Sequence, residues 1–243
     1  MSATPFPYQV FPLGDAAVTV DFGNHIDEAI NKEVLARFHQ LVKNPFPGMI
    51  EAVPAYSSYT VYYNSALVRH SKPALAAYET VKQELEKRLQ TASGYEQEEG
   101  RLFDIPVCYE DAFAPDIHYL ADTKKLAVEE VIRIHSSVVY KVYMLGFVPG
   151  FSYMGEVNER IAMPRKPQPQ QVTTGSVGIA GRQTGIYPLD SPGGWQIIGR
   201  TPLILFDPSK EHPALLNAGD KVRFFPISPT EFASIQNQSP AQL

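Results

Sequence analysis

Along residues 1–92, the spacing of the hydrophobic positions alternates between a pattern typical of strands and a pattern typical of helices. Val18, Val20 and Phe22 alternate with polar or small residues, whereas Ile26, Ile30 and the apolar residues that follow recur at helical spacing. The predicted elements are a strand at 18–22, a helix at 26–41, strands at 50–54 and 59–63, and a helix at 73–89. This order favours a split βαβ, ferredoxin-like layer.

The pattern changes after the polar, acidic stretch 91–100, which contains the linker that we predict at 93–100. The linker would separate a unit at 1–92 from a second unit at 101–243. The second unit has one clear amphipathic helix, at Glu129–His135, and a short helix after Pro229. Its other predicted elements are short strands between Gly/Pro turns, at 102–107, 139–144, 176–180, 196–199, 203–206 and 221–226. Many short strands predict a β-barrel or sandwich, so the fold class is α+β.

Composition and charge exclude several classes of function. The net charge is −5, whereas a nucleic-acid partner requires a basic surface. The single cysteine, Cys108, cannot form an internal disulfide or a cysteine-based zinc site, and we expect it to be buried. The six histidines show no metal-ligand spacing, so we predict no metal site and expect each histidine at the surface or at a helix cap.

No segment approaches the roughly 20 apolar residues that span a bilayer, and the N-terminus lacks the basic and apolar parts of a signal peptide. We therefore expect a cytoplasmic protein without a membrane partner.

The stretch Tyr143–Thr201 carries most of the chemical information, because glycines are dense in it and polar side chains stand between them. Glycine clusters in strands mark sharp bends or the close approach of a ligand or another backbone. The polar residues that we select as candidate substrate-binding residues are Arg165, Gln183, Thr184, Tyr187, Gln196 and Arg200.

These residue types suit a small polar ligand. The guanidinium groups of Arg165 and Arg200 match carboxylate or phosphate. Gln183 and Gln196 each carry a donor and an acceptor, as recognition of an amide or lactam requires, and Tyr187 adds a phenolic donor. We interpret the set as a ligand site or a subunit interface.

The alternative is that these side chains only hold the barrel loops in place. Arg165, for example, would then pair with Asp190 or Glu156. Lys166 is a weaker candidate for binding phosphate, and the favoured interpretation is a solvated lysine.

The chain matches none of the common catalytic motifs. It has no phosphate-binding G-x-x-x-x-G-K-[ST] and no G-x-G-x-x-G. The segment around Ser152 resembles a nucleophile elbow, but Met154 stands where the second glycine is required. We therefore assign no catalytic nucleophile or base.

Several runs of the sequence resemble the allophanate hydrolase subunit 1 family. In the second half they are Tyr143–Gly155, Met163–Lys166, Gly175–Gly185 and Pro192–Thr201. In the first half they are Pro12–Ala16, Pro45–Gly48 and Ile50–Pro54. The resemblance covers the chain from about Tyr8 to Pro226. The family includes the B subunits of bacterial ATP-dependent 5-oxoprolinases and an inhibitor of a sporulation histidine kinase.

The resemblance implies a ferredoxin-like first domain and a cyclophilin-like β-barrel second domain. It also implies an enzyme subunit that works only with subunits A and C of the complex, which opens 5-oxoproline to glutamate while hydrolysing ATP. The arginines would then face phosphoryl and carboxylate groups, and the glutamines would orient the lactam. The chain itself need not bind the ATP.

The same resemblance leaves a second function open, the inhibition of a histidine kinase by binding its dimerisation helices. An inhibitor would need exposed apolar side chains on one face of the barrel. Phe147, Phe151, Tyr153 and Met154 are the candidates for that face, and their alternative role is core packing.

Overall fold

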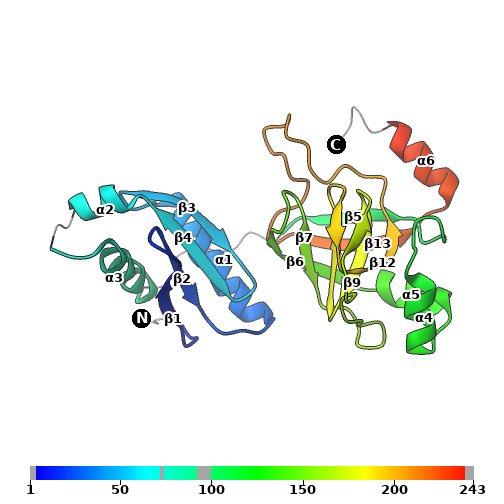
Figure 1. The fold of residues 1–243 in the computed structure, drawn as a ribbon, viewed down its shortest axis with the longest axis horizontal. Helices are drawn as coiled ribbons and strands as arrows, with labels where there is room; N and C mark the ends of the chain where they lie inside the picture. The colour runs from blue at the N-terminus through cyan, green and yellow to red at the C-terminus, as the bar shows by residue number, and fades with distance from the viewer. Residues whose placement is uncertain (1–3, 72–73, 92–99, 239–243) are drawn as a thin grey trace. The chain divides into compact units, whose positions relative to one another are not determined.

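The computed structural model describes residues 4–71, 74–91 and 100–238 (Figure 1). The chain forms two compact units, Met1–Glu98 and Glu99–Leu243. The predicted linker at 93–100 lies outside the described residues except for Gly100. Both units combine helices with β-sheet, which confirms a mixed fold of α and β elements.

The first unit is an antiparallel sheet with the strand order β1-β2-β4-β3, packed against helices. Its elements are β1 (Gln9–Pro12), β2 (Ala17–Asp21), α1 (Glu28–Lys43), β3 (Met49–Pro54), β4 (Ser58–Tyr63), α2 (Ser65–Ser71) and α3 (Ala77–Leu89). The sequence pattern did not predict β1 or α2. The helix predicted at 73–89 begins only at Ala77, and Pro73 lies outside the described residues.

Alternation along β2 and β4 builds the core of this unit. Val18 and Val20 are fully buried together with Val61 of β4, because residues two apart on a strand share one face. Apolar residues of both α1 and α3 join the same cluster. Helix α1 begins where the Asp27 carboxylate accepts a hydrogen bond from the backbone N–H of Ile30, at 2.9 Å.

The second unit is built on a seven-stranded sheet with the order β12-β9-β10-β7-β6-β13-β5. Its strands are β5 (Leu102–Val107), β6 (Val139–Leu145), β7 (Ser152–Gly155), β9 (Ser176–Ala180), β10 (Gln183–Ile186), β12 (Gln196–Arg200) and β13 (Lys221–Pro226). A separate two-stranded ladder joins β8 (Gln170–Val172) to β11 (Ser191–Gly193). The helices are α4 (Ile117–Lys124), α5 (Val128–Ser136) and α6 (Pro229–Gln238).

The two outer strands of the large sheet meet at one bridge. Cys108 and Arg200 exchange backbone hydrogen bonds of 2.8 and 2.9 Å, which join the end of β5 to the end of β12 and nearly close the barrel. Gly199 allows this approach, because a Cβ there would lie 2.5 Å from a methyl group of Val107. Cys108 is fully buried at this join, which confirms the expectation for the only cysteine.

The prediction of a strand at 203–206 is wrong. Apart from one isolated bridge between Phe206 and Ala214, this segment is irregular. Its alternating pattern arises because Leu205 is buried against the barrel core while Ile204 is exposed. Burial of a loop on one side thus gives the same alternation as a strand, and Pro202 lacks the N–H that a ladder requires.

His135 corrects the expectation that every histidine lies at the surface or at a cap. It is fully buried, stacked on Phe224, with Nδ1 2.9 Å from the Tyr109 hydroxyl and Nε2 3.0 Å from the Thr184 hydroxyl. The Thr184 hydroxyl donates to the carbonyl of Gly178, so it accepts from His135. Nε2 of His135 therefore carries a proton. Burial lowers the pKa of His135 from 6.5 to about 3.

This burial predicts a loss of stability in mild acid. Below pH 6.5 the unfolded chain binds a proton at position 135, and the folded chain does not until about pH 3. The free energy of unfolding of the second unit should therefore fall by an extra ~1.4 kcal/mol per pH unit in that range. Urea titrations followed by fluorescence of Trp195, the only tryptophan, measure this unit.

The comparison uses two variants. His135→Gln should remove the extra slope between pH 6.5 and 5. His118→Gln, which changes an exposed histidine, should keep it. Parallel pH profiles for the wild type and His135→Gln would contradict the assignment.

Candidate functional site

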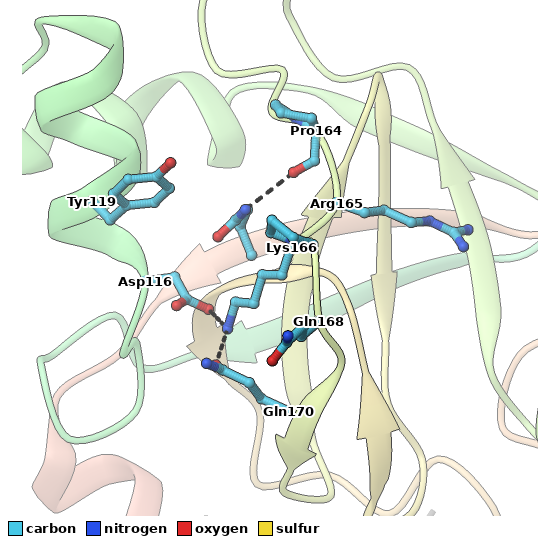
Figure 2. Close-up of a pocket in the computed structure, with 9 residues that line it drawn as sticks. Asp116, Tyr119, Pro164, Arg165, Lys166, Gln168 and Gln170 are labelled. Atoms are coloured by element: carbon cyan, nitrogen blue, oxygen red, sulfur yellow. Dashed lines mark hydrogen bonds and ion pairs between the residues drawn. The ribbon is translucent and has the colours of Figure 1, made fainter.

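Two adjoining clefts in the second unit share the short segment Arg165–Pro167. The first, which we call the polar cleft, has a volume of about 500 Å³. It is lined by Asp116, Tyr119, Pro164, Arg165, Lys166, Pro167, Gln168, Gln170 and Gln196 (Figure 2). The second, which we call the aromatic cleft, has a volume of about 440 Å³.

Three prolines shape the segment between the clefts. Pro164, Pro167 and Pro169 each lack a backbone N–H, so the chain runs here without joining the large sheet. One backbone hydrogen bond of 2.7 Å, from the N–H of Lys166 to the carbonyl of Gly194, fixes the segment. Successive side chains then point in different directions: in Figure 2, Lys166 extends toward Asp116 and Arg165 extends away from it.

A partly buried ion pair forms the floor of the polar cleft. The Lys166 ammonium lies 2.6 Å from the Asp116 carboxylate and donates to Gln170 at 2.9 Å, and the two charged side chains are 12% and 16% exposed. The interpretation of Lys166 as a solvated lysine is therefore wrong. Asp116 also accepts from the backbone N–H of Ile197 at 2.6 Å, which anchors the start of α4 to the edge strand β12.

Gln196 presents an acceptor to this cleft. Its side chain is 3% exposed, and its amide nitrogen donates to the carbonyl of Pro164 at 3.0 Å. Only the NH₂ group can donate to a carbonyl, so the orientation of the amide is fixed. The oxygen Oε1 has no partner within the described part of the chain. Gln196 can therefore accept a hydrogen bond from an N–H group of a ligand.

The aromatic cleft lies beside the polar cleft. Besides the shared residues it is lined by Phe147, Phe151, Tyr153, Pro169, Tyr187, Pro192, Gly193, Gly194 and Trp195. Phe151 contacts Tyr187 and Trp195 edge to face, with ring centroids 5.0 and 5.3 Å apart. Trp195 is 4% exposed, so it belongs to the core and also forms a wall of the cleft.

Tyr187 supplies a neutral hydroxyl here. Burial raises the pKa of Tyr187 to about 12, against the opposing effects of a backbone hydrogen bond with Trp195 and the nearby Arg165. The phenol is therefore protonated at neutral pH and can donate a hydrogen bond.

The Arg165 guanidinium has neither an ion pair nor a hydrogen bond with any described residue. The alternative pairing of Arg165 with Glu156 or Asp190 is wrong, because Glu156 pairs with Arg182 at 2.7 Å and Asp190 accepts from the backbone of Thr174. An exposed guanidinium between a polar and an aromatic cleft is available to an anionic ligand.

The structure brings three of the six predicted site residues together, namely Arg165, Tyr187 and Gln196. It does not place the other three at these clefts. Thr184 is fully buried beneath His135, and Gln183 stands at the start of β10 opposite Gly155 and Ala180. Arg200 donates to the carbonyl of Thr174 and covers the ring of Phe232. Their role in binding a substrate stays a prediction.

Sequence reasoning missed Asp116, Tyr119 and Gln170, and it underrated Lys166. Asp116 and Tyr119 stand far along the chain from the glycine-rich stretch, so only the anchoring of α4 on β12 brings them to the cleft. The prolines clustered at 164–169 were the one sequence signal for Gln170, because they mark a loop in this region.

Two other expectations are settled by burial. Ser152 is fully buried, which agrees with assigning it no catalytic role. Among the candidates for an exposed apolar face, Phe151 and Met154 are core residues at 1% and 0% exposure, whereas Phe147 is 62% exposed. These four residues therefore do not form a continuous apolar surface.

Residues 4–71, 74–91 and 100–238 contain neither a cluster of three candidate metal ligands nor a membrane-spanning helix. Within these ranges, no cluster of three or more His, Cys, Asp or Glu side chains is arranged to hold a metal ion. None of the helices they form is long and apolar enough to cross a membrane.

Residues 8–216 match the family model of the carboxyltransferase domain, subdomains C and D. The chain is also 45% identical over 236 residues to the 5-oxoprolinase B subunit of Bacillus subtilis (strain 168), an alignment that covers 96% of this chain and 98% of that protein. The chain belongs to the carboxyltransferase domain (subdomains C and D) family. Within the family, the 5-oxoprolinase B subunit of Escherichia coli O157:H7 is 39% identical over 88% of this chain and 94% of its own length.

Solved structures contain the same fold within longer chains. The crystal structure of TTHA0988 matches 87% of this family member with a TM-score of 0.74 and 35% identity, but the match spans only 40% of the TTHA0988 chain. The Kluyveromyces lactis urea carboxylase matches 98% of the chain with a TM-score of 0.75. At 20% identity, and over 24% of its length, that likeness shows the fold alone.

Adjacent glycines in the aromatic cleft give a matched test of its geometry. A Cβ at Gly193 would overlap the Tyr187 phenol, so Gly193→Ala should displace that ring and lower the free energy of unfolding by about 1–3 kcal/mol. A Cβ at Gly194 would meet only atoms 3.7 and 3.9 Å away, so Gly194→Ala should change stability by less than about 0.5 kcal/mol. Urea unfolding followed by Trp195 fluorescence compares them, and equal losses would refute the described packing of Tyr187.

Proposed function

We propose that this chain is the B subunit of an ATP-dependent 5-oxoprolinase, a complex that opens the lactam of 5-oxoproline to glutamate. The observation that carries the proposal is the 45% identity to a 5-oxoprolinase B subunit, over nearly the full length of both chains. Two further 5-oxoprolinase B subunits support it, at 39% and 46% identity.

The clefts suit the chemistry of such a substrate. A five-membered lactam is a poor electrophile, and its activation by ATP would place phosphoryl oxygens on or beside the lactam oxygen. Positive charge near that point stabilises the developing anion. Arg165 has no partner among the described residues and lies between the clefts, so we assign it to the substrate carboxylate or the phosphoryl group.

Two neutral groups would orient the lactam. Oε1 of Gln196 accepts from the lactam N–H, because the NH₂ group of the same side chain is held by Pro164. The Tyr187 hydroxyl donates to a substrate oxygen. Lys166 is already bound to Asp116 and Gln170, so we assign it to holding the cleft in shape.

Partner subunits complete the site in this proposal. The relatives from Bacillus subtilis and Escherichia coli are named as subunits, and a subunit is part of a larger assembly. The TTHA0988 chain continues well beyond the 40% that this chain matches, so additional polypeptide accompanies the same fold there. We therefore propose that subunits A and C supply the remaining groups, that the complex hydrolyses the ATP, that this chain is inactive alone and that the assembly works in the cytoplasm.

The assignment of each unit to a named fold is also part of the proposal. A ferredoxin-like first unit is supported by the pairing of β4 between β2 and β3, with both α1 and α3 in one core. A cyclophilin-like second unit is supported by the nearly closed barrel.

The function is tested by reconstitution. This chain is co-expressed with the subunits A and C of the same organism, and glutamate release from 5-oxoproline is measured with and without ATP. We expect ATP-dependent release from the three-subunit complex and none from this chain alone. A stable complex that releases no glutamate would refute the proposed activity.

The site is tested by two arginine variants in that complex. Arg165→Gln should lower glutamate release at least about tenfold, because a charged hydrogen bond to the substrate is lost, while urea unfolding stays unchanged. Arg200→Gln should lower stability, because the Thr174 carbonyl loses its donor, and should leave the rate per folded complex nearly unchanged. Full activity in Arg165→Gln would remove this residue from the site.

A further inference from the structure

The first unit contains an open cavity of about 800 Å³ that the proposed function does not use. Its lining residues come from the turn between β1 and β2, the end of β4, and the helices α2 and α3 with the residues just before α3. Figure 1 shows where these elements lie in the first unit. Asp15 and Arg69 are charged residues in its lining, and both are exposed. No ion pair joins them, nor does either side chain pair with any other described residue. Two opposite charges thus face the same cavity without neutralising each other.

The hydroxyl of a tyrosine that is otherwise buried also reaches this cavity. Tyr63 is 1% exposed and lines the cavity from the end of β4. Its hydroxyl has no hydrogen-bond partner within the described residues. The hydroxyl is open to the cavity, so it can donate to or accept from a ligand there. The pKa of Tyr63 is raised, first by burial and then by the negative charge of Asp15, which lines the same cavity.

The start of α3 supplies two further donors. Helix α3 begins at Ala77 after Ala76, which has no side chain able to cap it. The backbone N–H groups of Ala77 and Tyr78 therefore keep no partner among the described residues, and both residues line the cavity. The N–H groups of a first helical turn and the positive end of the helix dipole favour an anion at this point.

We propose that this cavity binds a small carboxylic acid that also carries an N–H donor, such as an amino acid or a lactam acid. The ligand carboxylate accepts from the N–H groups of Ala77 and Tyr78 and pairs with Arg69. Its nitrogen donates to Asp15, and the Tyr63 hydroxyl bonds to the ligand beside it. All of these residues belong to the first unit, and none of them lines the polar or the aromatic cleft.

The charges of the lining favour this ligand class over a simple anion. A phosphate or acetate would gain from Arg69 and the helix start but would be repelled by Asp15. A simple cation would gain from Asp15 and be repelled by Arg69. Only a molecule with an anionic group and a hydrogen-bond donor satisfies both side chains together.

The experiment is an amide NMR titration of the full-length ¹⁵N-labelled chain with glutamate, 5-oxoproline, acetate and inorganic phosphate. We expect glutamate or 5-oxoproline to shift the amide signals of Ala77 and Tyr78 saturably, and acetate to bind at least about tenfold more weakly. Arg69→Gln and Asp15→Asn should each weaken binding about tenfold, the usual effect of losing one charged hydrogen bond. Tyr63→Phe should weaken it severalfold.

Matched variants control for general effects on charge and fold. Tyr62→Phe removes a hydroxyl from the neighbouring residue of β4, which points to the opposite face and is 40% exposed. Lys87→Gln and Glu51→Gln remove exposed charges that lie outside the cavity lining. All three should bind as the wild type does.

The result for Asp15→Asn is decisive, because a simple anion and a ligand with an N–H donor predict opposite changes in binding affinity. A simple anion would bind more tightly once the carboxylate is neutralised, so tighter binding by Asp15→Asn would overturn the proposal. Absence of shifts at Ala77 and Tyr78 with both glutamate and 5-oxoproline would overturn it as well. Neither result would bear on the 5-oxoprolinase assignment, which is tested by turnover and by residues of the second unit.

Discussion

The reciprocal backbone hydrogen bonds between Cys108 and Arg200 are the contact on which the second unit depends. They join the two outer strands of a seven-stranded sheet, which would otherwise leave unpaired edges in water. The contact requires the absence of a side chain at Gly199, because the backbone of β12 passes directly over Val107. Once the sheet is closed there, the position of every loop around the end of β12 is restricted.

Both clefts follow from this closure. Asp116 bonds through its carboxylate and its own N–H to the backbone of Ile197 on β12, so the start of α4 is held against the closing strand. The proline-rich segment is held on its other side by the hydrogen bond from Lys166 to Gly194. The ion pair of Lys166 with Asp116 then joins α4 to that segment. A substrate group in the polar cleft would thus meet side chains positioned by backbone contacts, which is the rigidity that catalysis requires.

The polar residues of the glycine-rich stretch serve two different purposes. Thr184 completes a buried hydrogen-bond network with His135, and Arg200 supports a loop. Arg165 and Gln196 keep groups without partners among the described residues, at the surface of a cleft. Residue type alone does not separate these purposes, since arginine suits a carbonyl of its own chain as well as a ligand. The separation depends on which partners lie within hydrogen-bond distance.

Periodicity by itself determined most of the elements. Alternation located β2, and helical spacing located α1 and α5, because burial of one face imposes a regular pattern on the residues; turn residues marked the ends of β4 and β13. The glycine-rich motif likewise pointed to the region of Arg165, Tyr187 and Gln196. Only the tertiary structure decided that the segment at 203–206 is a loop, that His135 is buried, and that Asp116 pairs with Lys166. Contacts between residues far apart in the chain leave no periodic signal, so a burial pattern shows that a side chain is covered but not what covers it.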